Sequence, residues 1–254
     1  MSATADMERF SSYFSAPSSA LVKFQPLPTK RSVHFLSRPT SDYRLSVCQR
    51  LAWIAIKRPQ WHDVLIFAPG VGEIFELISK INQTLGELGV KDQHRIIPLF
   101  RDLPALEQNE IFSPAYKVNG IRIRKIIVAT PIAETSITVE GLSAVIDCGY
   151  HKQPTFDAVK GNLRFLLTPA TQTNCIQRWG RAGRIDEGHI FPLFTRETYD
   201  GLDKYPNPPI VLNDLTEAYL RLLTMSEGLP GPRVPALLGK SSRTRVSLLV
   251  LMYR

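Results

Sequence analysis

Short apolar runs alternate with segments whose apolar residues recur at helical spacing over most of the chain. The runs predict strands at residues 64–67, 94–99, 125–129, 144–146 and 190–194. The helical spacing predicts helices at about 41–58, 74–88, 104–111 and 171–182. The apolar runs show no period-two alternation, which is typical of parallel strands covered by helices on both faces. The pattern therefore predicts an α/β domain with a parallel sheet.

The alternation is lost towards both ends of the chain. Residues 1–32 are rich in serine and proline, which predicts a disordered arm before a domain at 33–205. Within that domain, a polar stretch at 157–162 lies between β-prone residues and predicts an inserted β-hairpin. Over 206–254 we expect a proline-rich linker, an amphipathic helix and the truncated start of a following domain.

Composition narrows the class of protein. The 254 residues are 44% hydrophobic, which is enough for a globular core. Three scattered cysteines do not form a disulfide framework or a zinc motif, and no apolar run reaches the roughly 18 residues of a membrane span. We therefore expect no membrane association and a cytoplasmic or nuclear location. The net charge is +8, and Lys and Arg are in excess over 117–184, which indicates an anionic partner.

The clearest chemical signal is the octet QRWGRAGR at residues 177–184. Arg181 and Arg184 are three positions apart and would share a face if the helix continued through them. The small residues between them would let the backbone approach another surface. Two guanidinium groups so placed suit one polyanion, such as a triphosphate. The alternative is a basic helix end that is merely solvated.

This octet resembles motif VI of the superfamily 2 helicases in its DEAH-box form. Residues 129–141, ATPIAETSITVEG, are similar to motif V of the same family. Residues 65–74 resemble the motif IV region, and 97–108 resemble the next RNA-contacting loop and helix. The resemblance covers about residues 33–225. It implies the second of two RecA-like domains of an ATP-dependent RNA helicase, a fold of the phosphate-loop NTPase type without a phosphate loop of its own.

The resemblance also implies roles for individual residues. Catalytic positions that reach the terminal phosphates of a nucleotide across the interdomain cleft are matched by Gln177, Arg181 and Arg184. Further positions on the nucleotide side are matched by Ser136, Thr138 and Glu140. Positions that face a nucleic-acid backbone are matched by Pro69, Gly70 and Thr130. Arg124 and Lys125 precede the motif V strand, so we expect them to supply phosphate contacts. The hairpin matches the strand-separating hairpin of the family.

The chain departs from the family pattern at two places near the expected nucleic-acid side. Pro131 replaces the asparagine that usually follows the threonine of motif V, so a backbone N–H and a side-chain amide are absent. Arg101 and Asp102 stand where the family often has small serines. Both changes put an expected polar contact to RNA in doubt, and neither touches the octet at 177–184.

Nucleotide binding in this family also needs the phosphate loop of the first domain, G-x-x-x-x-G-K-[ST]. Gly239, Lys240 and Ser241 match only its end, because Val234 stands where the first glycine should be. The sequence DEGH at 186–189 is expected to be a turn after the octet and not a magnesium-binding acidic box.

These features predict which ligands and partners the chain has. We expect ATP and Mg²⁺ to bind only in an assembly with a first RecA-like domain, in cis or in trans, and not to this chain alone. No metal site is expected within the chain. Single-stranded RNA is the expected partner, held through its backbone. A non-catalytic module that binds single-stranded RNA, or a degenerate helicase fragment, remains the alternative.

Overall fold

The computed structural model describes one long stretch of the chain and several shorter ones. The described residues are 30–113, 117–118, 120–131, 139, 141–157, 160, 162–184, 186–207 and the single positions 12, 15 and 212. The chain divides into two compact units, one formed by residues 1–152 and 167–206 and the other by 153–166 and 207–254. Residues 208–254 lie outside the described residues apart from position 212, and so does the expected linker helix.

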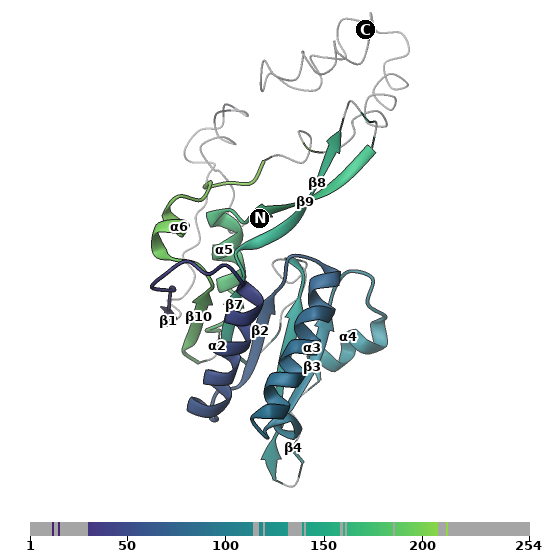
Figure 1. Ribbon diagram of the computed structural model, residues 1–254, viewed down its shortest axis with the longest axis vertical. Coiled ribbons are helices and arrows are strands. Elements are labelled where there is room, and N and C mark those ends of the chain that lie inside the picture. The colour runs from purple at the N-terminus through teal and green to yellow at the C-terminus, as the bar shows by residue number, and fades with distance from the viewer. Residues whose placement is uncertain are drawn as a thin grey trace, which may run out of the picture. The chain divides into compact units, whose positions relative to one another are not determined.

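A six-stranded sheet in the order β1-β10-β7-β2-β6-β3 forms the centre of the first unit (Figure 1). Its strands are β1 (Arg31–Val33), β2 (Asp63–Phe67), β3 (His94–Leu99), β6 (Arg124–Ala129), β7 (Leu142–Asp147) and β10 (Gly188–Pro192). Every pairing in it is parallel. This confirms the α/β class and the parallel sheet.

Helices cover both faces of this sheet. Figure 1 shows α2 (Tyr43–Lys57) and α3 (Val71–Glu87) side by side on the near face. The other face is covered by α4 (Ala105–Phe112) and α5 (Gln172–Trp179). Asp42 caps α2 by accepting hydrogen bonds from the backbone N–H groups of Arg44 and Leu45. Among the described residues, no helix combines the length and the apolar character needed to cross a bilayer.

The core explains why the strands show no alternation in the sequence. Val64 and Ile66 of β2 point into the cluster under α2 and α3, whereas Leu65 and Phe67 point into the cluster under α4 and α5. All four side chains are almost completely buried. Since both faces of each inner strand are covered, both faces carry apolar side chains.

The described residues also form several smaller elements. They are η2 (Lys91–Gln93), α6 (Arg196–Asp200), the antiparallel pair β4 (Lys117–Val118) and β5 (Ile121–Arg122), and the two-stranded sheet of β8 (Tyr150–Asp157) and β9 (Asn162–Pro169). The pair β8–β9 confirms the predicted hairpin. The sequence did not predict α6, β4, β5 or the edge strand β1, which begins inside the arm expected at residues 1–32.

The histidines of the first unit give the fold a predictable pH dependence. Burial lowers the pKa of His94 and of His151 below the ordinary value of 6.5, and nearby Arg124 and Arg178 respectively lower it further. The unfolded chain therefore binds more protons than the folded chain as the pH falls through about 6.5. We expect the free energy of unfolding to decrease from about pH 7.5 to about pH 5.5 in urea titrations. His94→Gln should reduce this decrease, and a stability that is flat or rises on acidification would contradict the prediction.

Candidate functional site

The predicted nucleic-acid residues Pro69, Gly70 and Thr130 lie at the carboxyl edge of the sheet. Pro69 and Gly70 follow the end of β2, and Thr130 follows β6, whose last residue Ala129 pairs with Phe67. The N–H of Thr130 donates to the carbonyl of Leu99 at 3.0 Å, which fixes the loop to β3. In open parallel α/β sheets, ligands bind outside the carboxyl ends of the strands. Two of the predicted segments are therefore brought together on one edge.

Lys152 is a residue of this edge that the sequence did not single out. Its N–H donates to the carbonyl of Pro69 at 3.2 Å, and its Nζ lies 2.9 Å from Oε1 of Glu73. Burial would raise the pKa of Glu73, but the hydrogen bond and charge of Lys152 outweigh it, so the pKa is lowered. Lys152 therefore holds the start of β8 against the Pro69–Gly70 loop. Its side chain is partly exposed there.

Arg124 and Lys125 do not lie on this edge. They occupy the opposite end of β6 and are only 6% and 4% exposed. The guanidinium of Arg124 donates to the carbonyls of Arg58, Pro59 and Trp61. The Nζ of Lys125 donates to the carbonyls of Ile111 and Ser113 and lies 3.9 Å from Oδ2 of Asp63. The expectation that they contact phosphates is corrected, because both side chains are buried and donate their hydrogen bonds to carbonyl groups of the chain itself.

The arginine-rich octet differs from its predicted geometry. Helix α5 begins at a capping box formed by Thr171 and Asn174 and ends at Trp179, with Gly180 as its C-cap. Arg181 and Arg184 therefore lie in a turn and share no helix face. The glycines do not destabilise the helix, because Gly180 is at its end and Gly183 lies beyond it. Arg184 is exposed, whereas Arg181 and Gln177 are half-buried.

Gly183 fastens this turn to the amino ends of two strands. It has a φ of +75°, and a Cβ there would lie 3.0 Å from Cγ of Arg31 and 3.2 Å from the carbonyl oxygen of Lys30. The Nε of Arg31 donates to the carbonyl of Ala182 at 3.0 Å. Burial and the charge of nearby Arg184 lower the pKa of Arg31. The turn is thus packed against the start of β1 and, through Gly188, of β10.

Gly183→Ala is expected to destabilise the chain. The left-handed backbone costs an alanine roughly 1–2 kcal/mol, and the close neighbours of the new Cβ add to that. The midpoint of urea unfolding should fall accordingly. Gly72→Ala is the matched control, because position 72 lies in α3 with nothing within 4 Å of the new Cβ. It should be neutral or stabilise by up to about 1 kcal/mol, and an equal effect at both positions would contradict the prediction.

Arg178 is the residue of the octet that sequence reasoning missed. It is completely buried, and its Nη1 lies 2.8 Å from Oδ1 of Asp147, which is also completely buried. The same nitrogen donates to the carbonyl of Tyr150 at 3.2 Å, and the guanidinium lies over the ring of Phe67. The indole N–H of Trp179 donates to the second carboxylate oxygen of Asp147 at 3.0 Å. The end of α5 is therefore anchored to the ends of β7 and β2.

The predicted site residues thus form two groups on the first unit. Pro69, Gly70 and Thr130 lie at the carboxyl edge, and the turn with Arg181 and Arg184 lies at the amino ends of β1 and β10. Buried Arg178 contacts Asp147 and Phe67, the last residues of β7 and β2. The motif V positions Ser136, Thr138 and Glu140 lie outside the described residues, as does the partial phosphate-loop match at 239–241.

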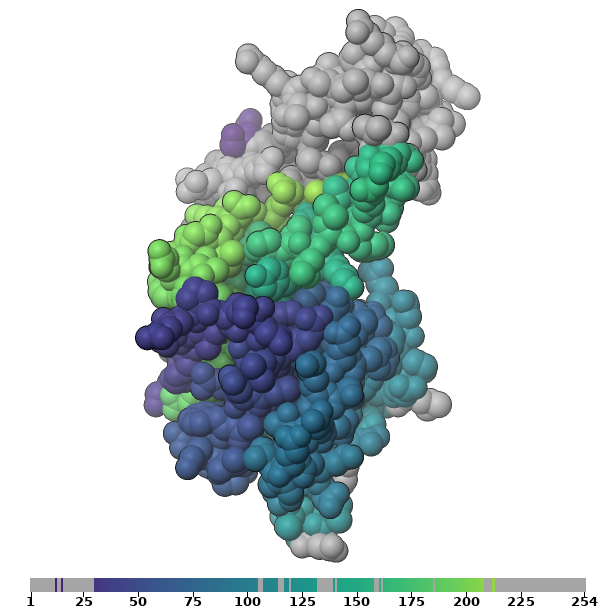
Figure 2. Space-filling view, in the orientation of Figure 1, coloured from purple at the N-terminus to yellow at the C-terminus, as the bar shows by residue number. Residues whose placement is uncertain are grey.

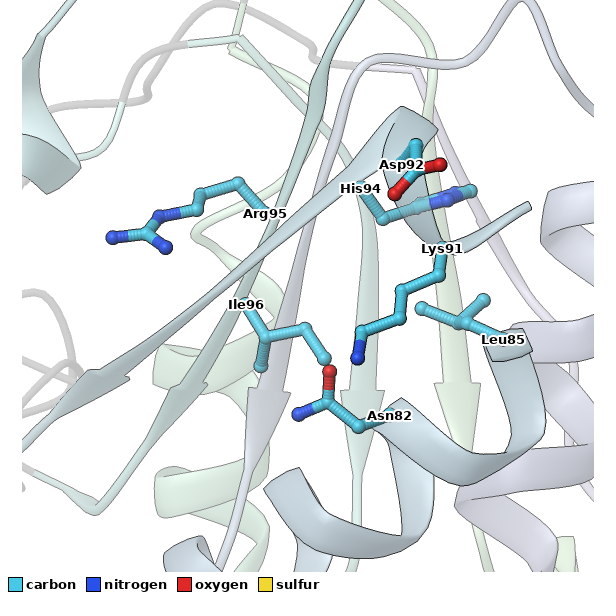
Figure 3. A pocket seen from close by; sticks show the side chains of 7 residues that line it. All are labelled: Asn82, Leu85, Lys91, Asp92, His94, Arg95 and Ile96. Carbon is cyan, nitrogen blue, oxygen red and sulfur yellow. The ribbon is translucent and has the colours of Figure 1, made fainter. Parts of the chain in front are cut away.

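The three cysteines are part of the packed interior. Cys48, Cys148 and Cys175 are buried, and burial raises the pKa of Cys148 to about 12. Within the described part of the chain, no group of His, Cys, Asp and Glu could hold a metal ion. A pocket of about 260 Å³ lies beside the amino end of β3 (Figure 3). It is lined by Asn82, Leu85, Lys91, Asp92, His94, Arg95 and Ile96 and contains none of the predicted site residues.

Residues 45–186 match the model of the helicase conserved C-terminal domain. The probable ATP-dependent RNA helicase DHR2 of Saccharomyces cerevisiae is 32% identical over 225 residues, 87% of this chain and 30% of that protein. The human ATP-dependent RNA helicase DHX33 is 32% identical over 228 residues, 89% of this chain and 31% of that protein. The chain therefore spans about a third of the length of these relatives.

The solved structures agree with these relatives. The Escherichia coli DEAH/RHA helicase HrpB aligns with a TM-score of 0.73 and 29% identity, over 89% of this chain and 27% of that chain. A second structure of HrpB, described as a DExH-box NTPase, has a TM-score of 0.67 and 28% identity, over 78% of this chain and 23% of that chain. Since the family model covers more than half of the sequence, the chain belongs to the helicase conserved C-terminal domain family, in the form found in DEAH-box RNA helicases.

Proposed function

We propose that this chain acts as the second RecA-like domain of an ATP-dependent RNA helicase and presents Arg181 and Arg184 to ATP held by a first RecA-like domain. The observation that carries the proposal is the turn after α5. Its main chain is fixed by Gly183 and Arg31, while the side chain of Arg184 is exposed. A guanidinium fork on a fixed turn suits the charge that develops in phosphoryl transfer.

Two further roles belong to this proposal. Gln177, one turn before Arg181, would assist in holding the terminal phosphate. The motif V residues Ser136, Thr138 and Glu140 would transmit the state of the nucleotide to the nucleic-acid edge. ATP and Mg²⁺ would bind only in the two-domain assembly, since the phosphate loop of this family belongs to the first domain.

The carboxyl edge is the proposed path of single-stranded RNA. The loops at Pro69–Gly70 and Thr130 are adjacent, and Lys152 adds a partly exposed ammonium group beside the first of them. Arg101 and Asp102 form an exposed turn close to the end of β3, at the same edge. The hydroxyl of Thr130 and the ammonium group of Lys152 suit phosphates and carry no base preference. Binding at this edge should therefore depend strongly on salt and weakly on RNA sequence.

The test is ATP turnover by the full chain mixed with the first RecA-like domain of a DEAH-box relative. We expect turnover that neither part shows alone and that rises when single-stranded RNA is added. No gain from mixing, with both parts folded, would contradict the proposal. Salt-sensitive RNA binding without any gain in turnover would identify the alternative, a non-catalytic RNA-binding module.

A further inference from the structure

A second surface of the first unit, on the outer side of α2, has features that the proposed function does not use. Helix α2 is apolar on the side that faces the sheet and also on the side that faces solvent. Leu45, Trp53 and Ile56 share the outward face and are 55%, 36% and 53% exposed. The helix forms part of the face seen in Figure 2. Exposed apolar side chains gathered on one helix face are a candidate interaction surface.

The guanidinium groups of two arginines lie over aromatic rings beside this stripe. The guanidinium of Arg58 lies 5.2 Å from the ring centre of Trp53 and 5.7 Å from that of Trp61. The guanidinium of Arg50 lies 5.6 Å from the ring centre of Trp53 and 4.6 Å from that of Phe191. These cation–π contacts restrict where each guanidinium lies before any partner arrives. We call Arg50, Trp53, Ile56, Lys57, Arg58 and Trp61 the tryptophan–arginine patch.

The patch is positively charged without local compensation. Helix α2 contains no acidic residue. Its first arginine, Arg44, pairs with Glu76 of α3 at 2.9 Å. Over the part of the chain that the structure describes, no ion pair is found for Arg50, Lys57 or Arg58. Lys57 and Arg58 lie at the carboxyl end of α2, where positive charges interact favourably with the helix dipole. Arg50 lies two turns earlier, so the helix dipole does not explain its positive charge.

We infer that the tryptophan–arginine patch docks a segment of a partner protein in which acidic side chains flank one or two apolar anchors. Charge complementarity requires carboxylates opposite Arg50, Lys57 and Arg58, and the exposed Ile56 and Trp53 require apolar groups between them. Tryptophan and arginine are the residue types that most often carry the binding energy of protein interfaces. A nucleic acid fits less well, because the rings that a base would stack on already contact other groups. His189 is stacked on Trp61 at 3.9 Å, and both guanidinium groups lie near the ring of Trp53.

The chemistry of the occupant can be read out with a random dodecapeptide display library panned against the immobilised full chain. We expect the selected peptides to be enriched in Asp and Glu around Leu, Phe or Trp. Synthetic versions should bind the double variant Arg50→Gln/Arg58→Gln at least tenfold more weakly than the unaltered chain. Ile56→Ser should weaken binding as well. Since Ile56 is half exposed, replacing it should not unfold the chain. Ile56→Ser therefore tests the inference even if the double variant proves unstable.

Matched controls lie on other helices. Lys80→Gln removes an exposed cation from α3, and Phe112→Ala removes an exposed ring from α4, so both should bind the selected peptides unchanged. Peptides without acidic enrichment, or equal binding to the variants, would overturn the inference. The inference would also be overturned if the double variant lost binding to a twelve-nucleotide uridine RNA, because the patch would then bind nucleic acid. The same holds if the double variant lost a self-association that the unaltered chain shows, because the patch would then bind a second copy. Since α2 lies outside both predicted site groups, failure here leaves the proposed function untouched.

Discussion

Replacing Arg181 or Arg184 with alanine is expected to lower the RNA-stimulated ATP turnover of the two-domain assembly by roughly 10³-fold or more. Each guanidinium would lie against the transferred phosphoryl group, where negative charge spreads over the equatorial oxygens and must be compensated. The turn that carries them is fixed by its main chain through Gly183 and Arg31. Truncating an arginine side chain should therefore leave the turn in place and remove only the charge.

The loss should appear in kcat, since the arginines contribute most when the transition state forms. Arg184→Lys should recover little, because an ammonium group cannot form the planar bidentate contact. Arg95→Ala is the matched control, an exposed arginine paired with Glu110 far from the turn, and it should retain full turnover. Loss of activity in the control, or turnover above a tenth of the original in Arg184→Ala, would contradict the assignment.

The second large effect concerns the buried pair of Arg178 and Asp147. Arg178→Met is expected to cost about 3–5 kcal/mol of unfolding free energy, because it leaves a buried carboxylate without its cation. The carboxylate of Asp147 still accepts hydrogen bonds from the indole of Trp179 and from the N–H of Gly149, so it is not left without any partner. Urea unfolding followed by circular dichroism would measure the change.

A double-mutant cycle separates this pair from its surroundings. Asp147→Leu in the background of Arg178→Met should recover part of the loss, because the second charge is then removed as well. The exposed pair of Arg95 and Glu110 is again the comparison, and breaking it should cost at most about 1 kcal/mol. A cost for Arg178→Met no larger than that of the exposed pair would show that the interior does not depend on this ion pair.

The inner strands could be predicted from the sequence because their residues carry the signal locally. The run at 64–67 is apolar, short and followed by the turn residues Pro69 and Gly70, and β2 begins only one residue before the predicted strand. The edge strand β1 could not be predicted in this way. Two of its three residues are exposed, and it exists only because β10, far along the chain, pairs with it. A local pattern contains no information about such a partner.

The candidate site, like the fold, could be predicted from the sequence only in part. The octet identified the arginine-rich segment, but its helical spacing hid the turn that Gly180 and Gly183 create. Arg124 and Arg178 are basic in sequence and buried in the structure. Carbonyl groups from a distant loop surround the first, and Asp147 neutralises the second. Charge in a sequence predicts exposure only when no partner is brought to it by tertiary packing.

The pairing of β1 with β10 also has a consequence for the order of events during synthesis. Ser32 of β1 bonds to Glu187, which lies 155 positions later. At a translation rate of roughly 5–20 residues per second, β1 emerges from the ribosome on the order of 10 s before its partner. During that interval the edge of the sheet is incomplete. The strand is only three residues long and begins at Arg31, next to Lys30, features that discourage pairing with foreign strands. Completion of the edge should thus be a late step by which the nascent domain becomes resistant to proteolysis.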